Sequence, residues 1–211
     1  YIIENLERIN IDTEYIQRIK NCNSGMSVAI SNSQGDYGAV IISGANLNIN
    51  IDVINDNSVW DNVEILMLQN EIDENINILS AKKAKEYGAK VFYNAAPAKK
   101  VNSNLYKLVD ILLVNTVEAE DISDQKIETL EDIKKASKIL STNIPTVIVS
   151  AGEYGAVLCA NNNEPIHFKN LKVKVNSTHG AGDTFAGTLC ASLILGKKIE
   201  EAIRIANSKA A

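Results

Sequence analysis

The sequence has 211 residues, is 45% hydrophobic and 5% aromatic, and carries a formal net charge of −5. This length suits one domain with a sizeable core. The acidic balance argues against nucleic acid or an anionic membrane surface as the main partner. No apolar run reaches membrane-spanning length, so we expect a cytoplasmic protein that has no membrane partner. The three cysteines lack metal-ligand spacing, which indicates reduced thiols.

Both ends of the sequence look cut. Tyr1 is not an initiator methionine, and the chain stops at Ala211 inside a helical pattern that has no stop signal. We therefore expect residues 1–211 to be a single but partial domain, truncated at both ends.

The N-terminal part of the chain predicts a helix followed by a hairpin. Apolar residues recur at helical spacing over residues 2–9. Residues 26–30 and 37–42 are strand-like and flank a polar turn, which is the pattern of a β-hairpin. A short helix is expected over residues 49–54.

From Val63 onward, apolar strand-like runs alternate with helical patterns. The predicted strands are 63–69, 91–93, 111–114 and 145–150, and the predicted helices are 74–87 and 129–140. Thr129 and Asp132 have the spacing of a capping box at the start of the second helix. Continuous apolar strands joined by helices indicate a parallel sheet covered on both faces. Short strands at 155–159, 166–168 and 171–175 follow, and then helices at 183–195 and 199–211.

Polar or small residues stand where four of the predicted strands end. These segments are 69–71 (QNE), 94–97 (NAAP), 115–118 (NTVE) and 150–152 (SAG). Ligands of doubly wound sheets bind beyond the carboxyl ends of the strands. We therefore expect the ligand site at this edge of the sheet.

The stretch 176–195 reads as a loop that leads into a helix N-terminus. Backbone N–H groups there have no intrahelical partner, so Gly180, Ala181 and Gly182 can offer donors to a phosphate. The charge of Asp183 would repel phosphate, so we interpret Asp183 as a base aimed at a hydroxyl beside the phosphate. The alternative is that this residue only caps the helix.

Together these motifs resemble those of the ribokinase, or PfkB, family of carbohydrate kinases. Residues 180–185 match the family's GAGDTF signature, residues 115–118 match its NxxE motif, and residues 94–98 (NAAPA) are similar to its NPAPA segment. Residues 24–26 and 43–46 look like two further ribokinase segments in the same order. The resemblance implies a three-layer α/β/α fold with a mostly parallel sheet, in which residues 24–43 form a candidate lid hairpin, part of a partial β-lid.

The resemblance also implies an ATP-dependent kinase that transfers the γ-phosphate to a hydroxyl of ribose or a related sugar. Asp183 would be the catalytic base and would touch the sugar, while Gly180, Ala181 and Gly182 would form an anion hole. Mg²⁺ would be held by Asn115 and Glu118 through its waters. A homodimer is expected for the full-length protein. The resemblance further implies that the nucleotide is bound by Asn115, Ser150, Gly152 and Gly155, and that Glu71 binds the sugar.

Some of these residues also suit a purely structural role. Asn115 suits a helix N-cap and Glu118 a first-turn acid, and Gly152 and Gly155 suit a tight turn. His167 is interpreted as structural. Two other functions stay open. The first is a nucleoside or hydroxymethylpyrimidine-type kinase, since residues 178–180 (THG) are similar to that branch, and the second is a non-catalytic sugar-binding module on the same fold.

Two departures from the family pattern change what we expect. Many members carry an Asp six residues before the catalytic Asp, where it helps to bind a monovalent cation, but this chain has Ser177. A neutral hydroxyl is a weaker ligand, which puts activation by K⁺ in doubt. The family's N-terminal sugar-gripping segment is not in the sequence, so we expect this chain by itself to bind sugar poorly.

Overall fold

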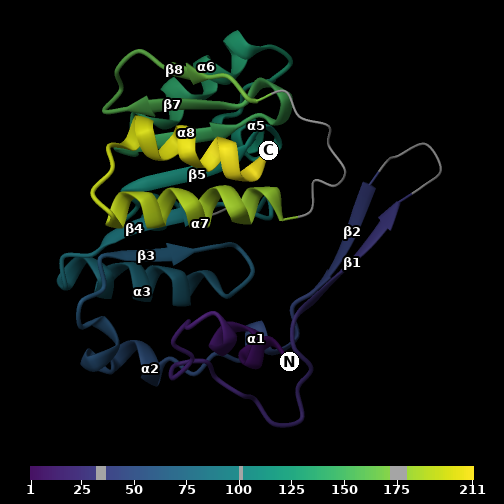
Figure 1. Ribbon diagram of the computed structural model, residues 1–211, viewed down its shortest axis with the longest axis vertical. Helices are drawn as coiled ribbons and strands as arrows, with labels where there is room; N and C mark the ends of the chain where they lie inside the picture. Colours follow the sequence, from purple (N-terminus) through teal and green to yellow (C-terminus); the bar gives the residue numbers. More distant parts are fainter. Residues whose placement is uncertain (32–36, 100–101, 172–179) are drawn as a thin grey trace.

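The computed structural model describes residues 1–31, 37–99, 102–171 and 180–211 (Figure 1). The predicted turn of the hairpin, most of the predicted strand 171–175, Ser177 and His179 lie outside the described residues. Within the described ranges, no helix combines the length and the apolar character needed to cross a membrane.

A six-stranded sheet forms the centre of the molecule (Figure 1). Its order is β3 (Ile65–Leu68), β4 (Lys90–Asn94), β5 (Ile111–Asn115), β6 (Thr146–Ser150), β7 (Ala156–Ala160) and β8 (Ile166–Phe168). The first four strands are parallel, β7 is antiparallel to β6, and β8 is antiparallel to β7. Since β8 therefore runs in the same direction as β6, the carboxyl ends of β3 to β6 and of β8 all lie at one edge.

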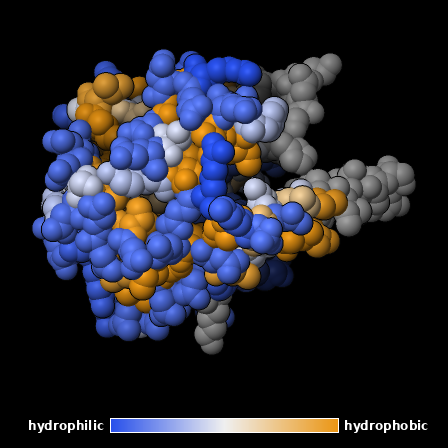
Figure 2. Space-filling view, turned by 90° about the horizontal axis from the view of Figure 1, so that it is seen from below, coloured by the Kyte–Doolittle hydropathy of each residue, from blue (hydrophilic) through white to orange (hydrophobic). Residues whose placement is uncertain are grey.

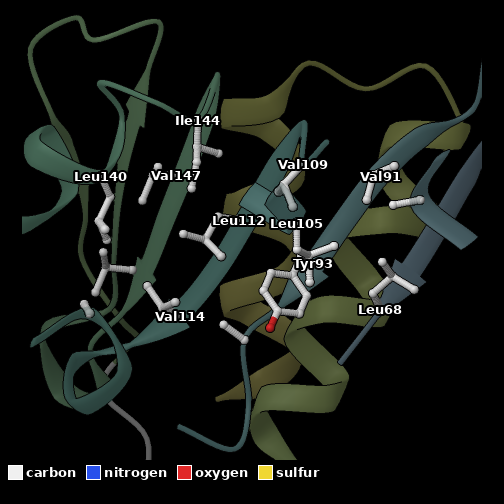
Figure 3. Packing of buried hydrophobic residues seen from close by; sticks show 14 of the residues in the cluster. Leu68, Val91, Tyr93, Leu105, Val109, Leu112, Val114, Leu140, Ile144 and Val147 are labelled. Atoms are coloured by element: carbon white, nitrogen blue, oxygen red, sulfur yellow. The ribbon is translucent and has the colours of Figure 1, made fainter. Parts of the chain in front are cut away.

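The inner strands are apolar at successive positions because both faces of the sheet are covered. Tyr93, Leu112 and Val147 face one side, which is covered by α3 (Glu74–Glu86), α4 (Ser103–Tyr106), α5 (Thr116–Ser123) and α6 (Leu130–Leu140) (Figure 3). Phe92 and Ile148 face the other side, which is covered by α7 (Ala181–Ile194) and α8 (Ile199–Ala210). This arrangement confirms the predicted three-layer α/β/α fold.

The N-terminal part consists of short elements and one hairpin. Helix α1 (Ile2–Arg8) precedes β1 (Met26–Ser31) and β2 (Tyr37–Ile42), which pair antiparallel and project away from the body of the molecule (Figure 1). The 3₁₀ turns η1 (Gly44–Leu47) and η2 (Asn57–Trp60) flank α2 (Asp52–Asn55). The short helix expected over residues 49–54 thus begins later, at Asp52.

Two helices of the described chain were not among those predicted. Helix α4 is a single turn, too short to show a periodic apolar pattern. Helix α5 has acidic residues among its eight positions and only a weak apolar stripe, so its sequence indicates a start at the Asn115 cap but no helical range. Both helices are placed by what surrounds them, since Leu105 of α4 and Ala119 of α5 are fully buried against the sheet.

Candidate functional site

The first turn of α7 carries backbone donors and one exposed carboxylate. Gly180 begins the helix with φ +74°, a left-handed conformation that favours glycine. Among the described residues, no heavy atom lies within 4 Å of a Cβ added at Gly180 or Gly182. Asp183 is exposed in the first turn. The first N–H groups of a helix lack intrahelical acceptors and carry the positive end of its dipole. An anion and a hydroxyl group can therefore approach the helix together.

Asn115 and Glu118 form a reciprocal capping box at the start of α5. The Glu118 N–H donates to Asn115 Oδ1 at 2.9 Å, and the Asn115 N–H donates to Glu118 Oε2 at 2.8 Å. The structural role considered for both residues is thus confirmed. Glu118 is only 4% exposed, and this burial raises the pKa of its carboxyl group although the hydrogen bonds with Asn115 act in the opposite direction.

The capping box leaves part of each side chain available to a cation. Only one carboxylate oxygen of Glu118 accepts from Asn115, and a carbonyl oxygen such as Asn115 Oδ1 has a second lone pair. Within the described ranges, Glu118 has no ion-pair partner, and no three His, Cys, Asp or Glu side chains are grouped to hold a metal. Mg²⁺ needs only one or two carboxylates because it keeps several waters. The pair fits that mode and does not fit a complete protein cage.

The β6–β7 loop (residues 151–155) follows directly beside this pair. Ser150 is the register partner of Asn115 on the adjacent strand, and its Oγ donates to the Val114 carbonyl at 3.3 Å. Gly155 is buried and has φ +87° and ψ −121°. A Cβ at this position would overlap the Phe168 carbonyl oxygen and lie 2.6 Å from the Asn170 nitrogen. The tight turn considered for Gly155 therefore exists, and its contact with nucleotide stays a prediction.

A buried polar network joins the ends of β3 and β4. Asn70 is 8% exposed, accepts from the Tyr93 hydroxyl through Oδ1, and donates through Nδ2 to the Ala95 carbonyl at 3.0 Å and the Pro97 carbonyl at 2.9 Å. Burial raises the pKa of Tyr93, so its hydroxyl stays a donor. No role for Asn70 was predicted from the sequence. Its only sequence signal is that an amide directly follows an apolar strand.

The strand order spreads the candidate residues along one edge of the sheet. Asn115 and Ser150 lie on adjacent strands, whereas Glu71 follows β3, with β4 and β5 in between. At about 4.8 Å per strand, the ends of β3 and β6 are ~14 Å apart. Figure 1 shows the N-terminal end of α7 at the same edge to which the arrowhead of β3 points. The structure thus brings Asn115 and Ser150 side by side at the ends of β5 and β6, places Glu71 three strands from β6, and has the start of α7 at the same edge.

Comparison with known proteins identifies the family of the chain. The model of the pfkB family of carbohydrate kinases matches residues 1–211. The chain is 31% identical over 195 residues to a ribokinase of Staphylococcus aureus, covering 92% of this chain and 64% of that protein. It is 29% identical over 205 residues to a ribokinase of Arabidopsis thaliana, covering 95% and 54%. The chain therefore spans about half to two thirds of the length of these curated relatives.

Solved structures share the fold. The structure of Arabidopsis thaliana ribokinase complexed with ribose and ATP has a TM-score of 0.84 at 28% identity, over 95% of this chain and 66% of that one. A ribokinase of Thermotoga maritima has a TM-score of 0.82 at 32% identity, over 100% and 68%. A nucleoside kinase of Burkholderia thailandensis in complex with inosine shares the fold alone, with a TM-score of 0.80 at 13% identity over 99% and 66%. The chain has a ribokinase-like fold and belongs to the pfkB family of carbohydrate kinases.

Proposed function

We propose that the complete protein is an ATP-dependent kinase that transfers the γ-phosphate of ATP to a hydroxyl of ribose or a related sugar. The observation that carries this proposal is the position of Asp183. This carboxylate is exposed in the first turn of α7, beside the N–H groups of Gly180, Ala181 and Gly182. Ribokinases at 29–31% identity and a ribokinase structure complexed with ribose and ATP support the substrates.

In this reaction the sugar oxygen attacks the γ-phosphorus as its proton passes to the Asp183 carboxylate. A new bond forms between the sugar oxygen and phosphorus, the bond between phosphorus and the β,γ-bridging oxygen breaks, and ADP leaves. A carboxylate is too weak a base to ionise an alcohol in advance, so it acts as the proton is lost in the transition state. The N–H groups at the start of α7 stabilise the charge on the phosphoryl oxygens.

The two substrates lie at different places along the sheet edge in this proposal. Ser150, Gly152 and Gly155 receive the nucleotide beside β6, and Glu71 touches the sugar beyond β3. Asn115 and Glu118 hold Mg²⁺ through its waters, and this ion supplies positive charge to the phosphates. The ~14 Å between the ends of β3 and β6 leaves room for a sugar and a nucleotide along the same edge.

The β1–β2 hairpin, within residues 24–43, is the lid in this proposal, and it forms a homodimer contact. Its register places Met26 opposite Ile42 and Val28 opposite Val40, so the four side chains share one face, on which they are 46–53% exposed. Apolar side chains of the hairpin border its grey tip in Figure 2. An isolated two-stranded ribbon is marginally stable, so the same face of a second copy is its expected partner. Sedimentation of the complete protein as a monomer at micromolar concentration would contradict the dimer.

A coupled assay of ADP release by the complete protein tests the activity. We expect turnover with ribose or a related sugar to exceed turnover with nucleosides and hydroxymethylpyrimidine. Asp183→Asn should lower kcat about 10²–10⁴-fold and leave ADP binding in place. ADP release that is the same with and without sugar would refute the proposed sugar kinase activity. ADP release that Asp183→Asn leaves unchanged would refute the role of Asp183 as the base. A cytoplasmic location and the exclusion of nucleic-acid and membrane partners stay predictions from the composition.

A further inference from the structure

We infer that His167 and Asn170 are positioning residues that hold the β6–β7 loop in the conformation that receives the nucleotide. The inference rests on the proposed function, in which this loop contacts ATP. Neither residue belongs to the motifs that identify the family, and both lie on or just after β8.

Each of the two side chains holds a different backbone carbonyl of the loop. His167 Nε2 lies 2.6 Å from the Tyr154 carbonyl oxygen, and Asn170 Nδ2 donates to the Gly152 carbonyl oxygen at 2.9 Å. Gly152 and Tyr154 are the first and last residues of the 3₁₀ turn η3 (Gly152–Tyr154). The turn is therefore held at both of its ends.

The donor on each side chain follows from the chemistry of its partner. A carbonyl oxygen only accepts, so His167 carries a proton on Nε2. The Leu171 N–H donates to Asn170 Oδ1 at 2.9 Å, which assigns the oxygen of this amide and turns its NH₂ group toward the loop. Both contacts thus depend on a donor that a nearly isosteric replacement can remove.

Strand pairing places the two residues beside the loop. In the β7–β8 register Ala156 pairs with Phe168 and Val157 pairs with His167. The chain beyond Phe168 therefore runs past residues 151–155, and it approaches Gly155 so closely that a Cβ has no room there. Within the loop, the Ala151 N–H donates to the Gly155 carbonyl at 2.7 Å and the Tyr154 N–H to the Ala151 carbonyl at 2.9 Å. The loop is ordered from within and held from the β8 side.

This support leaves the other side of the loop available to a ligand. Gly152, Glu153 and Tyr154 are exposed at the edge where Asn115 and Ser150 end their strands. A loop that is ordered before binding avoids the loss of conformational entropy that a loose loop suffers when it binds. Each hydrogen bond should then strengthen nucleotide binding by a factor of about 3–10.

Two substitutions in the complete protein remove the donors with little change in shape. Asn170→Asp keeps the acceptor for Leu171 but sets a carboxylate oxygen against the Gly152 carbonyl. His167→Phe keeps a ring of similar size and loses the N–H, while His167→Gln restores a donor. Asn163→Asp makes the same change of amide to carboxylate at the far end of the β7–β8 hairpin and is the matched control, since the hydrogen bonds of Asn163 within the described residues use its backbone N–H and carbonyl and not its side chain.

Calorimetry with ADP and, separately, with ribose provides the readout, together with KM for ATP and KM for ribose. We expect Asn170→Asp and His167→Phe each to raise the Kd for ADP and the KM for ATP about 3–10-fold, with KM for ribose unchanged. His167→Gln should recover part of the loss, and Asn163→Asp should bind ADP like the wild type. A general loss of structure would instead weaken the binding of both ADP and ribose.

The outcomes separate this inference from the proposed function. If Asn170→Asp and His167→Phe both bind ADP as tightly as the wild type does, the inference is overturned and the proposed function is not. Variants that lose affinity for ribose and ADP in equal proportion would overturn it too, because the residues would then serve overall stability. A wild-type protein that binds no ADP would overturn the proposed function and the inference with it.

Discussion

Replacing Gly155 by alanine tests whether the β6–β7 loop depends on a residue without a side chain. The backbone of Gly155, with φ +87° and ψ −121°, lies in a region that essentially only glycine occupies, and another residue there costs about 1–3 kcal/mol. The new Cβ would also overlap the Phe168 carbonyl oxygen and crowd the Asn170 nitrogen. Both atoms belong to the backbone of the adjacent segment at the end of β8 and cannot rotate away. Overpacking therefore adds about 1–3 kcal/mol to the cost of the substitution.

The expected loss in the free energy of unfolding is therefore about 2–6 kcal/mol. This is a large part of the roughly 5–15 kcal/mol by which a domain is stable. In a domain of this size 1 kcal/mol corresponds to roughly 2–4 °C, so Gly155→Ala should lower Tm by roughly 4–24 °C. Thermal and urea unfolding of the complete protein, followed by circular dichroism, measure the change.

Two further glycines separate the contributions to this loss. Gly88 has φ +79°, but a Cβ there would meet nothing within 4 Å, so Gly88→Ala reports backbone strain alone. Gly187 lies within α7, has no positive φ and has equal room, so Gly187→Ala should gain up to about 1 kcal/mol. Stability should decrease in the order Gly187→Ala, wild type, Gly88→Ala, Gly155→Ala. Unfolding of Gly155→Ala at the same denaturant concentration as Gly88→Ala would show that the close approach of Phe168 and Asn170 adds no cost.

Two other substitutions test the site. Burial raises the pKa of Glu118 above its ordinary value of 4.5, so the stability that its protonated form contributes is present below pH 4.5 and is lost as pH rises through the folded pKa. Glu118→Gln should remove this pH dependence from urea unfolding curves, and an unchanged pH profile would contradict the prediction. Asn70→Leu would leave the Tyr93 hydroxyl and the carbonyls of Ala95 and Pro97 without their partner, so we expect a loss of roughly 2–5 kcal/mol in the free energy of unfolding. Adding Tyr93→Phe should recover about 1 kcal/mol of that loss, and a double variant that is less stable than Asn70→Leu would argue against the network.

Several features of this protein follow from local sequence patterns. The apolar runs that became β4, β5 and β6 were predicted because buried parallel strands are apolar on both faces. The capping box of Thr129 and Asp132 was predicted and is present, since both of its hydrogen bonds join residues three apart. The same short spacing explains why Asn115 and Glu118 could be read both as a helix cap and as part of a kinase motif. The structure confirms the cap, and the role toward Mg²⁺ stays a prediction.

Contacts between residues distant in the chain were decided by the tertiary structure. Asn70 meets Tyr93 and Pro97 only because β3 and β4 are neighbours in the sheet, and His167 meets Tyr154 only because β8 turns back along β7. Nothing in the residues around Gly155 indicates that Phe168 approaches so closely. Composition and periodicity therefore determined the class of fold and the motifs at the strand ends. The partners of those motifs came from the order of the strands, which depends on how the two faces of the sheet are covered together and not on any single segment.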